Sequence, residues 1–142
     1  MEDVTILLVD DDQGHTELVR RNLQRSGIKN PIVAIANGSQ ALDYIFFRGD
    51  YAGQNENREL LVLLDINMPG IDGVEVLRQI KESPDAKKIP VLMLTTTDDP
   101  REINRCYELG CSVYITKPVE PAAFIEAIKR LGLFISIVKL PG

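Results

Sequence analysis

The sequence is poor in the residues that bind zinc or cross-link secreted domains. It contains one histidine and two cysteines among 142 residues. Cys106 and Cys111 fit no zinc-binding spacing, and we expect both to be free thiols in a cytoplasmic protein. We expect His15 to be a surface residue near the start of a helix, without a catalytic or metal-binding role.

Long apolar runs and targeting signals are also missing. No apolar run approaches the roughly 20 residues that a membrane helix needs. The acidic start MEDVTILLVD enters an apolar run at once, which is not typical of a secretory signal. A net charge of −5 argues against broad nucleic-acid binding. The sequence therefore predicts a cytoplasmic protein with neither a membrane nor a nucleic-acid partner.

What the chain does have is a regular alternation of apolar runs and amphipathic segments. The apolar runs predict strands at Val4–Val9, Pro31–Ala36, Leu60–Leu64, Pro90–Leu94 and Ser112–Thr116. The amphipathic segments predict helices at Gln13–Ser26, at Ser39–Arg48, after a cap at Asp72, from Pro100 to about Leu109, and from Pro121. The polar stretch Gly49–Glu59 predicts a loop. This order indicates one α/β domain, a parallel sheet with helices on both faces.

The third apolar run ends in a carboxylate. Leu60–Leu64 has the character of a strand buried on both faces, and Asp65 follows it directly. Asn67, Pro69 and Gly70 then form a turn-rich stretch that cannot continue the strand. Asp65 is therefore expected at the carboxyl end of a central strand, where open α/β sheets bind ligands.

Other polar residues follow the remaining strands. Asp10 and Asp11 come after the first, Thr95 closes the fourth, and Lys117 comes after the fifth. In a parallel sheet these ends share one edge, so the carboxylates would repel one another unless a cation lay among them. Mg²⁺ together with the Lys117 ammonium would supply that charge, because the available ligands are oxygens.

This arrangement indicates phosphoryl chemistry. Asp65 beside a metal ion is a candidate nucleophile toward phosphorus, and Thr95 and Lys117 could bind the phosphoryl oxygens. The pattern GxxxxGK[ST] is absent, so a nucleotide triphosphate is not expected to be the direct donor.

Simpler interpretations stay open for each group. Asp10–Asp12 could be a helix-capping cluster, Thr95–Thr97 ordinary strand-forming residues, and Tyr114 a strand aromatic. Two other classes of function also remain: a Mg²⁺-dependent phosphoester hydrolase, and a structural interaction module that binds its partners independently of phosphate.

Four motifs in the right order and spacing resemble the receiver domain of two-component signalling. They are VDDD at 9–12, LLDINMPGIDG at 63–73, PVLMLTT at 90–96 and YITKP at 114–118. The resemblance covers about residues 4–131. It implies a flavodoxin-like (βα)5 fold, with residues 1–142 forming a single receiver domain and 132–142 an apolar C-terminal extension.

The resemblance also implies roles around a metal ion. Asp65 would be the phosphoacceptor. Asp11 would contact Mg²⁺ directly and Asp10 mainly through water, while Asn67 would offer its backbone carbonyl. In the family, the positions of Asn67 and Thr97 tune dephosphorylation, although both could be plain turn residues.

Three further residues would bind phosphate and transmit the signal. Thr95 and Lys117 would bind the phosphoryl oxygens, and the ring of Tyr114 would turn inward when Thr95 moves. The expected protein is a phosphorylation-dependent switch that takes its phosphoryl group from a histidine kinase phosphohistidine. It would not be an enzyme beyond self-directed phosphotransfer and autodephosphorylation, and its output would pass through protein contact or a phosphorelay.

Two segments indicate a particular group within the receiver family. The Gly49–Glu59 insertion and the tail Leu131–Gly142 look like those of small single-domain regulators that serve phytochrome-type histidine kinases. The tail has too many apolar residues to leave in water, and both a helix and a strand fit its pattern. We expect a homodimer formed through this tail and the face of the fourth helix, fifth strand and last helix.

Overall fold

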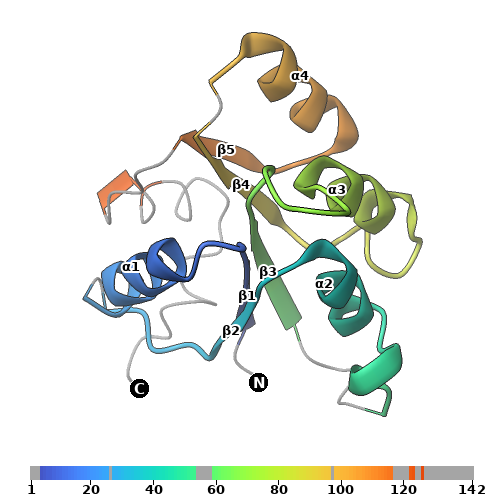
Figure 1. Ribbon diagram of the computed structural model, residues 1–142, viewed down its shortest axis with the longest axis horizontal. Helices are drawn as coiled ribbons and strands as arrows, with labels where there is room; N and C mark the ends of the chain where they lie inside the picture. Colours follow the sequence, from blue (N-terminus) through green and yellow to red (C-terminus); the bar gives the residue numbers. More distant parts are fainter. Residues whose placement is uncertain are drawn as a thin grey trace.

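The protein is an α/β domain built around one sheet (Figure 1). The computed structural model describes residues 4–25, 27–53, 59–96, 98–116, 122–123 and 126. The strands are β1 (Val4–Val9), β2 (Ile32–Ile35), β3 (Glu59–Leu64), β4 (Val91–Thr95) and β5 (Val113–Thr116). The helices are α1 (Gln13–Arg25), α2 (Gly38–Ile45), the 3-10 helix η1 (Gly49–Tyr51), α3 (Gly73–Glu82) and α4 (Pro100–Leu109).

The five strands form one sheet in the order β2-β1-β3-β4-β5, and every neighbouring pair is parallel. The predicted five-stranded parallel sheet and flavodoxin-like α/β class are therefore confirmed. The order places β1, β3 and β4 in the interior. Their near-continuous aliphatic sequences follow from burial on both faces.

Helices cover both faces of the sheet, and alternate strand residues point to each. Leu7 and Val9 of β1 belong to the core cluster that includes buried residues of α2, α3 and α4. Ile6 and Leu8 belong to a second cluster, which includes Val19 of α1. Figure 1 shows α1 on one side of the strands and α2 and α3 on the other. The two clusters hold the carboxyl edge of the sheet in place from both sides.

Local capping signals in the sequence give the predicted helix ends. Asp72 caps α3 by accepting a hydrogen bond from the Glu75 amide (2.9 Å), and Asp99 caps α4 in the same way. Pro100 occupies the first helical position, where its missing N–H is not needed. Gly110 ends α4 in the left-handed conformation with φ 109°.

The region after α2 differs from the sequence prediction. The helix ends at Ile45 rather than Arg48, because Phe47 adopts a left-handed φ of 57° that an α-helix cannot accommodate. The predicted loop begins with the short helix η1, whose Tyr51 ring packs edge-on against Tyr44 at a centroid distance of 5.1 Å. This part of the insertion is therefore ordered against the core. Residues 54–58 lie outside the described residues.

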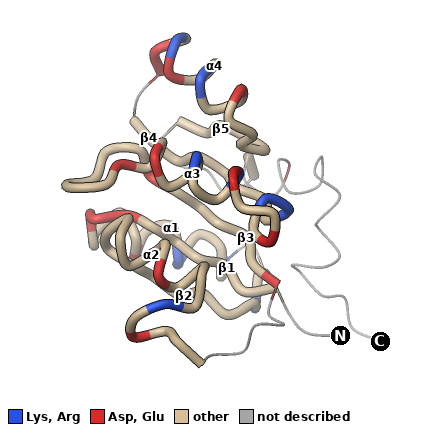
Figure 2. The backbone as a smooth tube through the Cα atoms, turned by 90° about the vertical axis from the view of Figure 1, so that its right-hand side faces the viewer, with Lys and Arg blue, Asp and Glu red and all other residues tan. Residues whose placement is uncertain are grey.

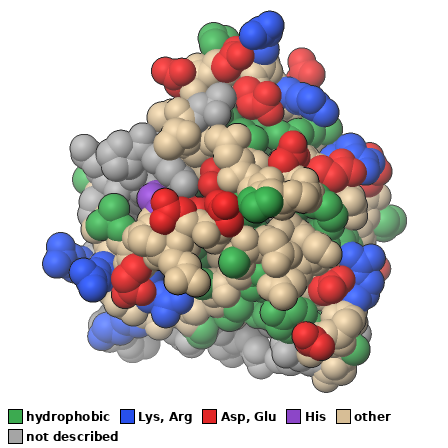
Figure 3. Space-filling model, viewed as in Figure 1, with side chains coloured by type: hydrophobic (Ala, Val, Ile, Leu, Met, Phe, Trp, Pro, Cys, Tyr) green, Lys and Arg blue, Asp and Glu red, His purple; other side chains and the backbone are tan. Residues whose placement is uncertain are grey.

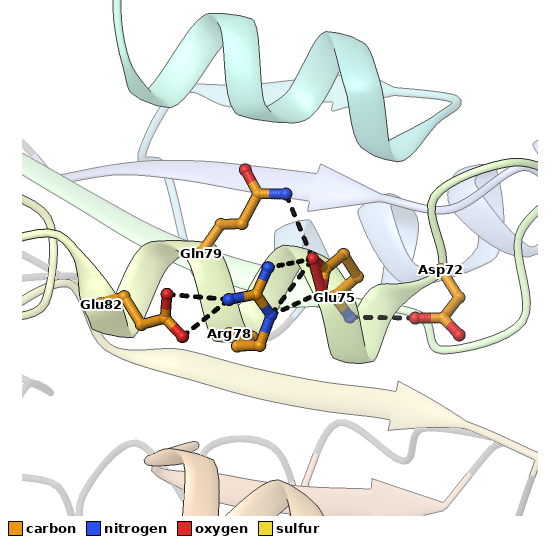
Figure 4. A network of polar contacts seen from close by, with 5 residues as sticks. All are labelled: Asp72, Glu75, Arg78, Gln79 and Glu82. Atoms are coloured by element: carbon orange, nitrogen blue, oxygen red, sulfur yellow. Dashed lines mark hydrogen bonds and ion pairs between the residues drawn. The ribbon is translucent and has the colours of Figure 1, made fainter.

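The outward surface of α3 carries an ion-pair network (Figure 4), and Figure 2 shows acidic and basic positions along this helix. Arg78 lies between Glu75, three residues before it, and Glu82, four residues after it, and donates hydrogen bonds to both carboxylates. These bonds raise the pKa of Arg78 and lower that of Glu75. Such pairs add modest support to a helix. Here the supported helix is the one whose first residue packs against Asp65.

Several predictions concern residues outside the described part of the chain. Lys117, Thr97, the apolar tail and most of the last helix are among them, although positions 122, 123 and 126 are helical. Cys106 and Cys111 are buried free thiols, as predicted. Burial raises their pKa values to about 11 and about 12. Within the described ranges, no helix is both long and apolar enough to cross a bilayer.

Candidate functional site

The register of β1 and β3 places two carboxylates side by side. Val9 and Leu64, the last residues of these strands, are direct partners in the sheet. The next residues continue the pairing: the Asp65 amide donates to the Val9 carbonyl oxygen (3.0 Å), and the Asp10 amide donates to the Ile35 carbonyl oxygen (3.1 Å). Asp10 and Asp65 are thus fixed at the carboxyl edge by sheet hydrogen bonds.

Asp11 completes a cluster of three carboxylates. One oxygen from each of Asp10, Asp11 and Asp65 lies within 4.8 Å of the others. Asp10 and Asp65 are only 4% and 6% exposed, whereas Asp11 reaches solvent. Figure 3 shows acidic side chains gathered beside the histidine on this face. Partly desolvated carboxylates at this spacing repel one another, and their oxygens are the donors that a hard divalent cation prefers.

The turn after Asp65 brings helix α3 against the acidic residue. The Gly73 amide donates to the Ile66 carbonyl oxygen (2.9 Å), which closes the turn. A Cβ atom at Gly73 would lie 2.1 Å from the Asp65 carbonyl oxygen, so only glycine fits there without a shift of the backbone. Asn67 is exposed, and its amide approaches Asp65 Oδ1 at 3.4 Å. The close approach of α3 thus fixes the backbone of Asp65.

Asp12 has a different position from the other acids of its run. Its Oδ1 accepts a hydrogen bond from the His15 amide (3.1 Å), and its carbonyl oxygen accepts one from the Thr16 amide (2.9 Å). It therefore caps α1. The capping interpretation applies to Asp12, while Asp10 and Asp11 converge with Asp65 from the distant third strand.

Thr95 lies at the same edge of the sheet, at the end of β4. It is fully buried and pairs with Thr116 of β5. Lys117 follows Thr116 directly in the sequence, but it lies outside the described residues. The structure therefore places the carboxylates and Thr95 at the predicted edge.

Tyr114 lies on β5 and packs, half-buried, against the core cluster shared with α4. Burial is the main cause that raises the pKa of its phenol to about 12. Its backbone amide donates to the hydroxyl oxygen of Tyr107 on α4 (3.1 Å). The sequence analysis missed Tyr107, which links α4 to the edge strand, because no local motif marks this contact.

The prediction of a surface position for His15 is wrong. Its Nδ1 atom lies 2.6 Å from Oδ2 of Asp10, and its side chain is only 11% exposed. The available signal was its position three residues after the capping Asp12. The first turn of α1 carries this ring back toward the end of β1, directly against the acidic cluster.

The sequence and the fold match those of known signalling proteins. Residues 6–129 match the Response regulator receiver domain family. The chain is 39% identical over 138 residues to Response regulator Rcp1 of Synechocystis sp. (strain ATCC 27184 / PCC 6803 / Kazusa), covering 96% of this chain and 92% of that protein.

Solved structures give the same result. The bacteriophytochrome response regulator RtBRR superposes with a TM-score of 0.87 at 38% identity, covering 99% of this chain and 85% of that one. The Mn²⁺-bound form of Rcp1 has a TM-score of 0.75 at 34% identity, with 98% and 99% covered. The phosphorylated cyanobacterial phytochrome response regulator RcpA has a TM-score of 0.78 at 34% identity, with 94% of each chain covered.

The chain belongs to the response regulator receiver family. It is a phosphorylation-dependent signalling protein of the two-component class, whose receiver domains partner with histidine kinases. The predicted family and class of function are thus confirmed.

Proposed function

We propose that Asp65 accepts a phosphoryl group from a kinase phosphohistidine. The observation that carries this proposal is the convergence of Asp10, Asp11 and Asp65 within 4.8 Å at the carboxyl edge. An Asp65 oxygen forms the new P–O bond while the P–N bond of the phosphohistidine breaks. The imidazole leaves with the electron pair. Hydrolysis of the aspartyl phosphate later returns the carboxylate, as the domain's own autodephosphorylation.

Mg²⁺ is the metal that we assign to this site. Side-chain oxygens of Asp10, Asp11 and Asp65, with the backbone carbonyl of Asn67, would hold it. The all-oxygen donor set supports a hard cation, and the related Rcp1 has a Mn²⁺-bound form. When bound, the ion offsets negative charge on the phosphoryl oxygens during transfer.

Thr95 and Lys117 are the proposed phosphoryl-binding groups, and Thr95 with Tyr114 forms the switch. In this proposal Thr95 moves toward the phosphate and Tyr114 follows. Tyr114 is held to α4 through Tyr107, so its movement would alter the α4–β5 face. A local charge thus biases two arrangements of one surface. Such a change would alter partner choice without any further domain.

The proposed kinase is of the phytochrome type, and the proposed location is the cytoplasm. Support for the kinase comes from the similarity to the bacteriophytochrome regulator RtBRR and to RcpA over nearly the whole chain.

Incubation with acetyl phosphate tests the phosphoryl-accepting function. We expect intact-protein mass spectrometry to show one added phosphoryl group with Mg²⁺ and none with excess EDTA, because the carboxylates need a cation to admit a phosphoryl group. The Lys117→Ala variant is expected to take up the label but to lose any change in assembly that labelling causes in the wild type. Labelling that is equal in EDTA would contradict the metal role, and turnover of a generic phosphoester would instead favour a hydrolase.

We also propose a homodimer formed through the α4–β5 face and the tail. β5 is an edge strand whose residues are partly buried or exposed, and Tyr107 of α4 is 48% exposed. The tail adds apolar residues at Phe134, Ile135, Ile137, Val138 and Leu140. An apolar surface of this kind is typical of a subunit interface.

Removal of the tail tests the dimer. We expect the chain cut after Gly132 to sediment as a monomer at concentrations where the full chain sediments as a dimer. The loss of apolar contact area is the physical reason. If both proteins are folded by circular dichroism and the truncated chain has the same oligomeric state as the full chain, the tail is not part of the interface.

A further inference from the structure

His15 makes a side-chain contact that its place on a helix does not require. It lies in the first turn of α1, where its amide completes the Asp12 cap. Its ring turns the other way, toward the sheet, with Nδ1 2.6 Å from Oδ2 of Asp10. The side chains are 11% and 1% exposed, so the contact is shielded from water.

The two oxygens of Asp10 both have protein donors. Oδ1 accepts the Asp12 amide hydrogen at 2.9 Å, and Oδ2 faces His15 Nδ1. A carboxylate that binds a metal ion is ionised and only accepts hydrogen bonds, so in that state Nδ1 is the donor of this contact. A protein donor on each oxygen fixes the plane of the carboxylate.

The other ring nitrogen of His15 is buried at an unfavourable free energy. Nε2 of His15 is buried and has no hydrogen-bond partner among the described residues. Burying such an atom is unfavourable, and an apolar side chain of similar size would fill the space without that cost. The bond from Nδ1 to Asp10 is the interaction that offsets it.

We propose that His15 is a positioning residue of the metal site. Its Nδ1–H holds Asp10 so that this carboxylate stays with Asp11 and Asp65 despite their mutual repulsion, which preorganises the three oxygens for Mg²⁺. Residues that orient metal ligands by hydrogen bonds raise metal affinity without touching the ion. This inference rests on the proposed Mg²⁺ site and adds a residue to it.

Two amide variants separate this role from simple space filling. In His15→Asn the amide nitrogen is attached to Cγ, as Nδ1 is in histidine, so it can reach Asp10. In His15→Gln the amide nitrogen is one atom further out, near the place of Nε2, although the side chain is closer to histidine in size. Positioning therefore predicts that Asn is the better substitute, and space filling predicts that Gln is.

The measurement is Mg²⁺ titration of each full-length protein by calorimetry, at one pH and without phosphodonor. We expect His15→Asn to bind within about threefold of the wild type, and His15→Gln and His15→Leu to bind about tenfold more weakly. Thermal melting without Mg²⁺ identifies folded variants, and the Asn–Gln comparison stands even if His15→Leu does not fold. Any result in which Asn does not bind Mg²⁺ more tightly than Gln overturns the positioning role. A wild type that binds no Mg²⁺ would instead overturn the metal site itself.

Discussion

Replacement of Asp65 by asparagine is expected to abolish phosphoryl incorporation from acetyl phosphate in the presence of Mg²⁺. The amide keeps the size and one oxygen of the carboxylate, but it is not a competent nucleophile toward phosphorus. The variant also removes one of three charges that lie within 4.8 Å. Relief of repulsion worth about 1 kcal/mol or more should make the folded state at least as stable as the wild type.

Intact-protein mass spectrometry measures the incorporation, and thermal melting confirms the fold. Asp12→Asn is the matched control, because Asp12 caps α1 and asparagine is also a good cap residue. We expect the control to keep its phosphoryl uptake. If Asp65→Asn still takes up a phosphoryl group, another residue is the phosphoacceptor.

Gly73→Ala is expected to be the most destabilising single-methyl change near the site. The new Cβ would lie 2.1 Å from the Asp65 carbonyl oxygen and 2.8 Å from the Ile66 Cα atom. Both are backbone atoms, so α3 or the end of β3 must shift. We expect a loss of about 3 kcal/mol in the free energy of unfolding, and slower phosphoryl uptake because the acceptor moves with its backbone. Urea denaturation followed by circular dichroism measures the loss.

Gly14→Ala provides the comparison for this variant. Among the described residues, a Cβ at Gly14 would come within 4 Å of the Asp12 Oδ1 atom alone, at 3.3 Å, and this side-chain atom, which caps the His15 amide, would have to shift by only a few tenths of an ångström. Alanine favours a helix over glycine by up to about 1 kcal/mol, so this variant should unfold at a similar or higher urea concentration. If the Gly73→Ala protein is as stable as Gly14→Ala, α3 can shift away from the end of β3 at little cost in free energy of unfolding.

Features set by local sequence could be predicted well. The apolar run of β1 gave its bounds, Val4–Val9, and capping residues gave both ends of α4. The edge that holds Asp10, Asp11 and Asp65 followed from one general rule, that carboxyl ends of parallel strands share an edge. The termini of β2, β3, β4 and β5 shifted by one residue at one or both ends, since ladder hydrogen bonds rather than composition decide where a strand stops.

Two kinds of contact could not be predicted: those between residues distant in sequence, and those that depend on the direction in which a helix points a side chain. The sequence shows that His15 is near a helix start, but not that the first turn rotates its ring onto Asp10. The Tyr107 hydroxyl reaches the Tyr114 amide only because α4 packs along β5. No feature of the sequence around Phe47 predicts its left-handed backbone conformation, so the prediction extended α2 too far.

The strand order has a consequence for the assembly of the nascent chain. From β1 the polypeptide runs out to the sheet margin at β2, then crosses back so that β3 lies on the other side of β1. A ribosome-bound chain that stops after β2 holds Asp10 and Asp11 but has neither Asp65 nor the strand that brings it there. The cluster of three carboxylates can therefore form only after β3 has been synthesised and has crossed over to the other side of β1.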